Sequence, residues 1–124
     1  MAQLIELLAK LRPSVKIVMV YLAEAHAADT WPLGFDINQP KNISERDQNC
    51  KNLLDRFPAL RDSIDAVFLD TMDNEFNKVT GAWPEKYFFA DDEGIITWKS
   101  PTEPKGTEPF DLALRFAMEN GIIN

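Results

Sequence analysis

Apolar positions along the chain follow two different periods, which predict alternating helices and strands. Ala2 to Leu11 places apolar residues at helical spacing, and Pro13 ends this predicted helix. Val15 to Leu22 is almost continuously apolar and rich in β-branched residues. Such a run is typical of a strand buried on both faces of a parallel sheet covered by helices.

The next segment, Ala23 to Lys41, is long and irregular because prolines and a glycine interrupt every period. Loops of this length in compact domains are usually functional or mobile. A helix is then predicted from about Ile43 to Phe57, with Asn42 as its N-cap and Glu45 three residues later. One face of this helix is expected to carry Ile43, Arg46, Cys50, Leu53, Leu54 and Phe57.

The second half of the chain predicts three further strands, a short helix and a final helix. The short helix ends near Thr80, and the turn Asp91 to Gly94 joins a hairpin in which Gly94 supplies a positive φ. The final helix is predicted over Phe110 to Asn120, with Gly121 just beyond its end. The strands are expected at Ile64–Leu69, Glu85–Ala90 and Ile95–Lys99. The resulting order, α-β-α-β-α-β-β-α, predicts one α/β domain covering residues 1–124.

Composition narrows the class of protein. The 124 residues are 45% hydrophobic and carry a net charge of -7. This balance argues against nucleic acid or anionic membrane surfaces as partners, since both require a basic patch. No apolar run is long enough to span a bilayer, and no signal-peptide pattern is present. We therefore expect a soluble, cytoplasmic protein.

Chemistry-bearing residues gather just after the first strand, at Glu24, His26, Asp29 and Trp31. Glu24 and His26 are two apart at a strand end, so both side chains can point to one side. A neighbouring carboxylate orients an imidazole and favours its charged form, which suits acid–base chemistry. From the residues alone, a surface histidine beside an acid is the more common arrangement.

Other candidate sites are weaker. Cys50 is the single cysteine, and it lies mid-helix on the apolar face, where a thiol is normally a small buried hydrophobic group rather than a nucleophile. Trp31, Phe35 and Trp83 are candidates for an aromatic pocket, although aromatic residues are more often core. The segment Asp70 to Asn74 lacks the spacing of a calcium loop, so no metal site is expected.

Several ordered segments together are similar to the iodothyronine deiodinases, a thioredoxin-fold family of selenoenzymes. The strongest is the end of the first strand through His26, followed by Asp29 and Trp31. The others are Glu45-Arg46 with Leu53 to Phe57, Leu69 to Asn74, Trp83 to Lys86, and Lys105-Gly106. Pro40 stands near the position where some members of the family place a second active-site histidine.

The resemblance implies a fold and a site. The fold would be a thioredoxin-like three-layer α/β/α arrangement with a mixed sheet, and Pro84 would be a cis-proline candidate. Glu24 and His26 would be catalytic, and Trp31 and Lys105 would bind substrate. The first strand and the selenocysteine motif would be missing here, because the family carries them just upstream of the first helix.

The resemblance also implies the chemistry. It is reductive deiodination of a small aromatic substrate, with a thiol reductant as cosubstrate and with no metal or other cofactor. The nucleophile would be absent from this chain. Two alternatives stay open: a non-catalytic thioredoxin-fold binding or scaffold protein, and a peroxiredoxin-like enzyme, against which the single Cys50 argues.

The missing strand has a structural consequence. It is expected between the strands at Val15–Leu22 and Ile64–Leu69, so these two must either pair directly or leave open edges. Because open edges invite association, a homodimer is a further expectation. Direct pairing in a well-behaved monomer would support the non-catalytic alternative.

Overall fold

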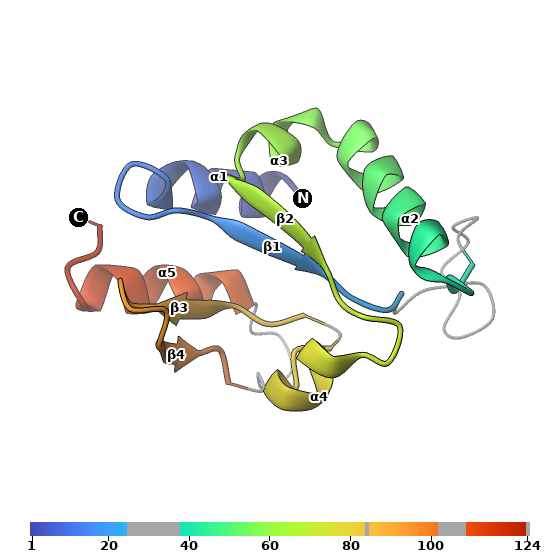
Figure 1. Cartoon of the computed structure of the whole chain (residues 1–124). Helices are drawn as coiled ribbons and strands as arrows, with labels where there is room; N and C mark the ends of the chain where they lie inside the picture. Colours follow the sequence, from blue (N-terminus) through green and yellow to red (C-terminus); the bar gives the residue numbers. More distant parts are fainter. Residues whose placement is uncertain (25–37, 84, 102–108, 124) are drawn as a thin grey trace. The chain divides into compact units, whose positions relative to one another are not determined.

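Residues 1–24, 38–83, 85–101 and 109–123 are described in a computed structural model, in which helices and strands alternate (Figure 1). The chain divides into two compact units, Ile17–Pro84 and Met1–Lys16 with Glu85–Asn124. The single domain over residues 1–124 stays a prediction. Within the described residues, no helix is both long enough and apolar enough to cross a membrane.

The unit Ile17–Pro84 is built on two parallel strands, β1 (Val18–Tyr21) and β2 (Ala66–Leu69). They pair directly, in a register that sets Val18 opposite Ala66 and Tyr21 opposite Leu69. Direct pairing is one of the two expected outcomes. The same unit contains the helices α2 (Ile43–Arg56), α3 (Pro58–Asp62) and α4 (Glu75–Thr80).

Local sequence signals account for where these helices begin. The Asn42 side chain accepts a hydrogen bond from the Glu45 backbone N–H at 2.9 Å, which confirms the predicted N-cap of α2. The short helix α3 was not predicted. It begins at Pro58, whose fixed φ and missing N–H suit the first turn of a helix.

The other unit packs helix α1 (Ala2–Leu11) against helix α5 (Pro109–Glu119) and adds a hairpin. Strands β3 (Phe88–Ala90) and β4 (Ile96–Lys99) are antiparallel, and Gly94 in their turn has φ +81°, as predicted. The aromatic rings of this unit form a cluster, with centroids 4.9–5.8 Å apart, made of Phe89, Trp98 and Phe116. The buried apolar residues of the two helices are Leu7, Leu8, Leu11, Ala113 and Ala117.

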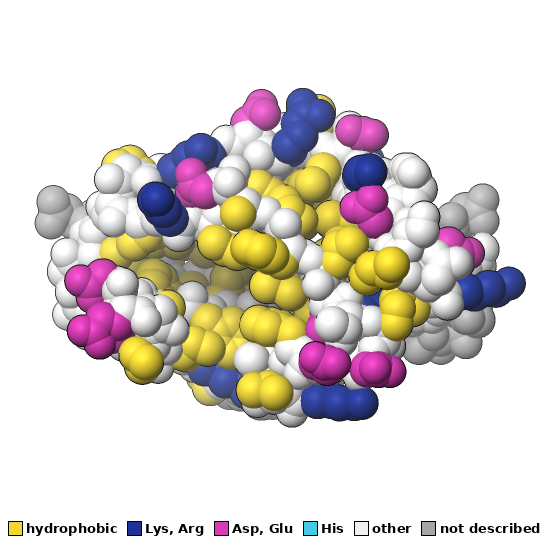
Figure 2. All heavy atoms as spheres, viewed as in Figure 1, with side chains coloured by type: hydrophobic (Ala, Val, Ile, Leu, Met, Phe, Trp, Pro, Cys, Tyr) yellow, Lys and Arg dark blue, Asp and Glu magenta, His cyan; other side chains and the backbone are white. Residues whose placement is uncertain are grey.

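The described strands do not pair into the single mixed sheet that was expected. The four described strands form two two-stranded sheets, one parallel and one antiparallel. The expectation that the first strand is buried on both faces is wrong, because Val18 is exposed and the rest of β1 is only partly buried. Each described strand has one hydrogen-bonded neighbour. On β2 the Phe68 side chain is 59% exposed, and Figure 2 shows apolar side chains gathered over this strand.

Candidate functional site at the carboxyl edge of the parallel strands

The parallel pairing of β1 and β2 brings two loops to one edge of their sheet. Chain segments that leave the carboxyl ends of parallel strands emerge at the same edge, where α/β proteins usually bind ligands. Glu24 lies three residues beyond Tyr21, and Asp70 directly follows Leu69. The candidate site is therefore built from these two loops and from the part of α2 that contacts them.

Asp70 organises the loop between β2 and α4. Its carboxylate accepts hydrogen bonds from the backbone N–H groups of Thr71 (2.8 Å), Phe76 (2.9 Å) and Asn77 (3.1 Å). The Thr71 hydroxyl accepts the N–H of Glu75 at 3.2 Å. The first three N–H groups of α4, which have no partner within the helix, are thus all bonded to side chains. Asp70 is 2% exposed and acts as a structural cap.

Arg46 reaches this loop from α2. Its guanidinium donates hydrogen bonds to the carbonyl oxygens of Asp70 (2.9 Å) and Thr71 (2.6 Å) and to Asn74 Oδ1 (3.2 Å). Asn74 adopts a left-handed conformation with φ +57°, which asparagine tolerates better than most residues. Arg46 is only 2% exposed, and its Nε is buried without a hydrogen-bond partner.

Glu24 lies on the other loop of the edge. Its backbone N–H donates to Gln39 Oε1 at 3.2 Å, and the Gln39 amide donates to the Glu24 carbonyl oxygen. The Glu24 Oε1 atom is buried and accepts no hydrogen bond. Burial raises the pKa of the Glu24 carboxyl above its ordinary value, and the nearby charge of Arg46 opposes this rise. Glu24 therefore keeps its proton to a higher pH than an exposed glutamate does.

Trp83 adds an aromatic side chain next to Glu24. The indole Nε1 donates a hydrogen bond to the Ala23 carbonyl oxygen at 3.1 Å. The Trp83 backbone N–H donates to Asn77 Oδ1 at 2.8 Å, which ties it to the end of α4. The side chain is 38% exposed, so a partly accessible aromatic surface is bonded to the backbone at Ala23, the residue before Glu24.

Cys50 is unsuited to nucleophilic chemistry. It is 3% exposed, four residues after Arg46 on the same face of α2. Burial, followed by the negative charges of Asp47 and Glu24, raises the pKa of its thiol to about 11. At pH 7 only about one molecule in 10⁴ would carry the reactive thiolate. The expectation of a buried, inert thiol is confirmed.

The sequence-predicted site is only partly within the described residues. Glu24 is described, whereas His26, Trp31, Pro84 and Lys105 lie outside the described ranges. The roles of Arg46 and Asp70 were missed. A usable signal existed for Arg46, because it is a charged residue on the otherwise apolar face predicted for α2. Among the described residues, no group of three acidic, histidine or cysteine side chains is placed to hold a metal.

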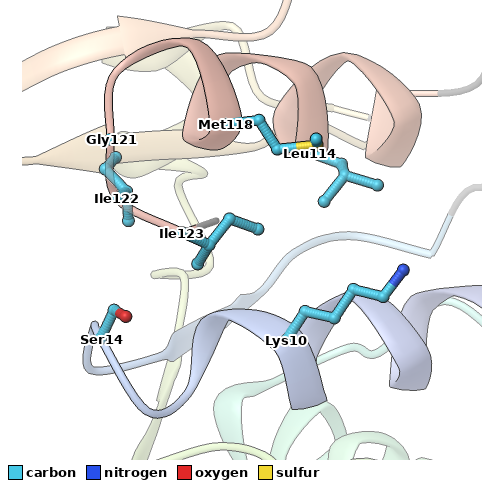
Figure 3. A pocket seen from close by; sticks show the side chains of 7 residues that line it. All are labelled: Lys10, Ser14, Leu114, Met118, Gly121, Ile122 and Ile123. Carbon is cyan, nitrogen blue, oxygen red and sulfur yellow. The ribbon is translucent and has the colours of Figure 1, made fainter.

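A hollow lies in the other unit, between α1 and α5, with a volume of about 390 Å³ (Figure 3). Its ionisable side chain is Lys10, and Ser14 lies near the loop that follows α1. Figure 3 shows apolar side chains facing this hollow from α5 and the segment after it. The lining is completed by Leu114, Met118, Gly121, Ile122 and Ile123. The residues that line this hollow include no aspartate, glutamate, histidine or cysteine.

Comparison with known proteins gives one consistent result. The sequence model of a family described as iodothyronine deiodinase matches residues 1–119. Type I iodothyronine deiodinase from Xenopus laevis is 31% identical over 97 residues, which cover 77% of this chain and 36% of the relative. The chain thus spans about a third of the length of the curated relative that it matches.

Proposed function

Because this chain belongs to the iodothyronine deiodinase family, we propose that it is a deiodinase-like oxidoreductase domain that removes iodine from an aromatic substrate. The substrate class that fits the family is an iodothyronine, and the reductant is a thiol. The proposed fold is the thioredoxin-like arrangement. The observation that carries the proposal is the part-buried Glu24 carboxyl at the carboxyl edge of the parallel strands, whose Oε1 atom is buried without a hydrogen bond and whose pKa is raised.

The overall reaction needs two electrons and one proton. An aryl iodide and two thiols give the deiodinated ring, a disulfide, iodide and a proton. When the carbon–iodine bond breaks, the ring carbon keeps the electron pair and takes up a proton. A carboxyl whose pKa is raised above the ordinary value is a better proton donor for this step than an exposed one. Glu24 is proposed as that donor, and His26, two residues later in the sequence, is proposed to orient or relay the proton.

The attack on iodine requires a selenolate or a thiolate. The sequence contains one thiol, Cys50, and its burial and pKa of about 11 make it a poor nucleophile. We propose that the attacking selenium or sulfur is supplied from outside these 124 residues, and that selenocysteine is the family's usual choice. The described site would then provide proton delivery and substrate contacts, and not the electrons.

The remaining proposed site residues lie outside the described ranges. Trp31 would contact the aromatic rings and Lys105 an anionic group of the substrate, while Pro84 would be the cis-proline that adjoins the redox centre. Trp83, which precedes Pro84 in the chain, is held beside Ala23 by its indole hydrogen bond. This contact supports the proposal that the Trp83–Pro84 segment borders the site.

The test is a thiol-dependent iodide-release assay on an iodothyronine. This chain would be compared with a form extended at its N-terminus by the family's strand and active-site segment, with cysteine in place of selenocysteine. We expect activity in the extended form alone, loss of that activity on Glu24→Gln, and retention on Cys50→Ala. Activity that survives Glu24→Gln, or that disappears with Cys50→Ala, would refute the assigned roles.

A non-catalytic binding domain is the second candidate. The direct pairing of β1 and β2 favours it, because the two strands complete a sheet without a further strand between them. This candidate predicts that iodothyronine binds, as measured by calorimetry, while the extended form releases no iodide under any thiol condition. Iodide release by the extended form would exclude it.

A further inference from the structure

Three hydrogen bonds of Asn77 link the start of the short helix α4 to the segment that follows this helix. The Asn77 backbone N–H donates to Asp70 Oδ2 at 3.1 Å, and its backbone carbonyl oxygen accepts the Gly81 N–H at 2.7 Å. Its side-chain Oδ1 accepts the Trp83 backbone N–H at 2.8 Å. The first bond ties Asn77 to the residue that follows β2, and the other two hold the chain as it leaves α4.

The chain can turn back towards Asn77 because of the glycine at the end of α4. Gly81 adopts a left-handed conformation with φ +65°, which a residue without a Cβ reaches at no steric cost. The next residue, Ala82, is 3% exposed and anchors the turn by its burial. The N–H that Asn77 Oδ1 accepts comes one residue later. The position of the Trp83 backbone is therefore set by the turn, by a buried alanine and by the Asn77 side chain.

The Trp83 side chain extends this link to the end of β1. Its indole Nε1–H donates to the Ala23 carbonyl oxygen at 3.1 Å, across 60 residues of sequence. This bond uses the single donor of the indole ring. The side chain is 38% exposed, so part of the ring stays accessible to a ligand. Trp83 is thus an aromatic group that is held at its backbone and at its ring, next to the residue that precedes Glu24.

We propose that Asn77 is a positioning residue that fixes the Trp83 indole at the carboxyl edge, where the accessible part of the ring contacts an aromatic ring of the substrate. The inference rests on the proposed function in one respect, namely that the substrate is an iodinated aromatic compound. Asn77 touches neither substrate nor reacting atoms in this role, and it acts through Trp83.

The expected effect is on substrate affinity. Aromatic rings prefer offset-stacked or edge-to-face contacts, so a ring that is already oriented needs less ordering when the substrate binds. Without the Asn77 Oδ1 acceptor, the Trp83 N–H would bond to water and the indole would sample several orientations. The entropy of ordering one such side chain corresponds to a rise of about three- to tenfold in the Kd of an aromatic substrate.

The experiment follows the Trp83 indole of this chain by ¹H–¹⁵N NMR, with its Nε1–H signal assigned by Trp83→Phe. The variants are Asn77→Ala, which removes the acceptor, and Asn77→Asp, which keeps an oxygen in its place. The matched control is Asn52→Ala, because Asn52 Oδ1 also accepts a hydrogen bond, from Gln48 at 2.8 Å on an exposed part of α2. The affinity of each protein for diiodothyronine is measured by calorimetry.

In Asn77→Ala we expect the Trp83 indole signal to shift, its hydrogen to exchange faster with water, and the Kd of diiodothyronine to rise about three- to tenfold. Asn77→Asp should restore values close to wild type, and Asn52→Ala should change neither measurement. A shifted indole signal with unchanged affinity would overturn the proposal, since Asn77 would then serve the fold alone. An unchanged indole signal in Asn77→Ala would overturn it as well.

A second variant covers the case in which Asn77→Ala does not fold. Trp83→Ala removes the ring but keeps the backbone N–H that Asn77 accepts, and it should weaken diiodothyronine binding at least as much as Asn77→Ala. Unchanged affinity in Trp83→Ala, or a wild-type chain that binds no diiodothyronine, would refute the contact assigned to Trp83. Neither measurement uses iodide release, so the extended form decides the proposed function separately.

Discussion

Replacing Asp70 by alanine is the sharpest test of how the carboxyl edge is built. The carboxylate is 2% exposed and accepts three backbone N–H groups at 2.8–3.1 Å. A hydrogen bond to a charged group contributes about 1.5–3 kcal/mol, and freed N–H groups regain part of this from water. Three such bonds sum to more than about 4 kcal/mol, and because water replaces part of this contribution we expect a net loss of about 3 kcal/mol in the free energy of unfolding for Asp70→Ala. Asp70→Asn keeps an oxygen acceptor and should lose about 1 kcal/mol.

Urea unfolding followed by circular dichroism measures this loss. With a slope of about 1.5 kcal/mol per M, the midpoint of Asp70→Ala should fall by about 2 M. The matched control is Asp73→Ala, an exposed carboxylate in the same loop, which should change stability by no more than about 0.5 kcal/mol. A loss below about 1 kcal/mol for Asp70→Ala, or an equal loss for Asp73→Ala, would refute the capping role.

Two further predictions concern Cys50 and Glu24. Because folding raises the pKa of the buried Cys50 thiol to about 11, folded protein at pH 8 should react with iodoacetamide at least about a hundredfold more slowly than urea-unfolded protein, and equal rates would contradict its burial. The pKa of Glu24 is raised on folding from 4.5, so the folded state binds its proton more tightly than the unfolded state. Wild-type stability should therefore fall as pH rises from about 4.5 through the raised pKa, relative to Glu24→Gln. Urea midpoints of the two proteins at several pH values measure this difference, and parallel pH profiles would contradict it.

Local signals in the sequence predicted most of the elements. Helix α1 covers the predicted residues, and the N-cap Asn42 and the turn glycine Gly94 act as their side-chain chemistry requires. The strands are shorter than predicted, since apolar runs extend beyond the residues that pair. Helix α3 was missed because a five-residue helix leaves too short a pattern to detect.

The candidate site was predicted only where it lies next to a strand end. Glu24 could be found because polar residues after an apolar run mark the rim of a sheet. The contacts of Arg46 could not, because they join residues 24–28 positions apart and depend on how α2 packs. Asp70 resembled part of a metal loop in sequence, yet its carboxylate oxygens accept backbone N–H groups. A short sequence pattern does not distinguish an aspartate that binds a metal from one that caps a helix, because both use the same carboxylate oxygens.

The described residues divide the proposed chemistry into two parts that can be tested apart. Replacement of iodine by hydrogen consumes a proton and two electrons, and the carboxyl edge offers a group suited to the first and none suited to the second. Burial, followed by the negative charges of Asp47 and Glu24, keeps the Cys50 thiol protonated. Burial is the largest of these causes, so Cys50 stays a poor nucleophile whether or not Glu24 carries a proton. Any deiodination by this domain must therefore draw its electrons from a chalcogen other than Cys50, so proton delivery and electron supply should respond to different mutations.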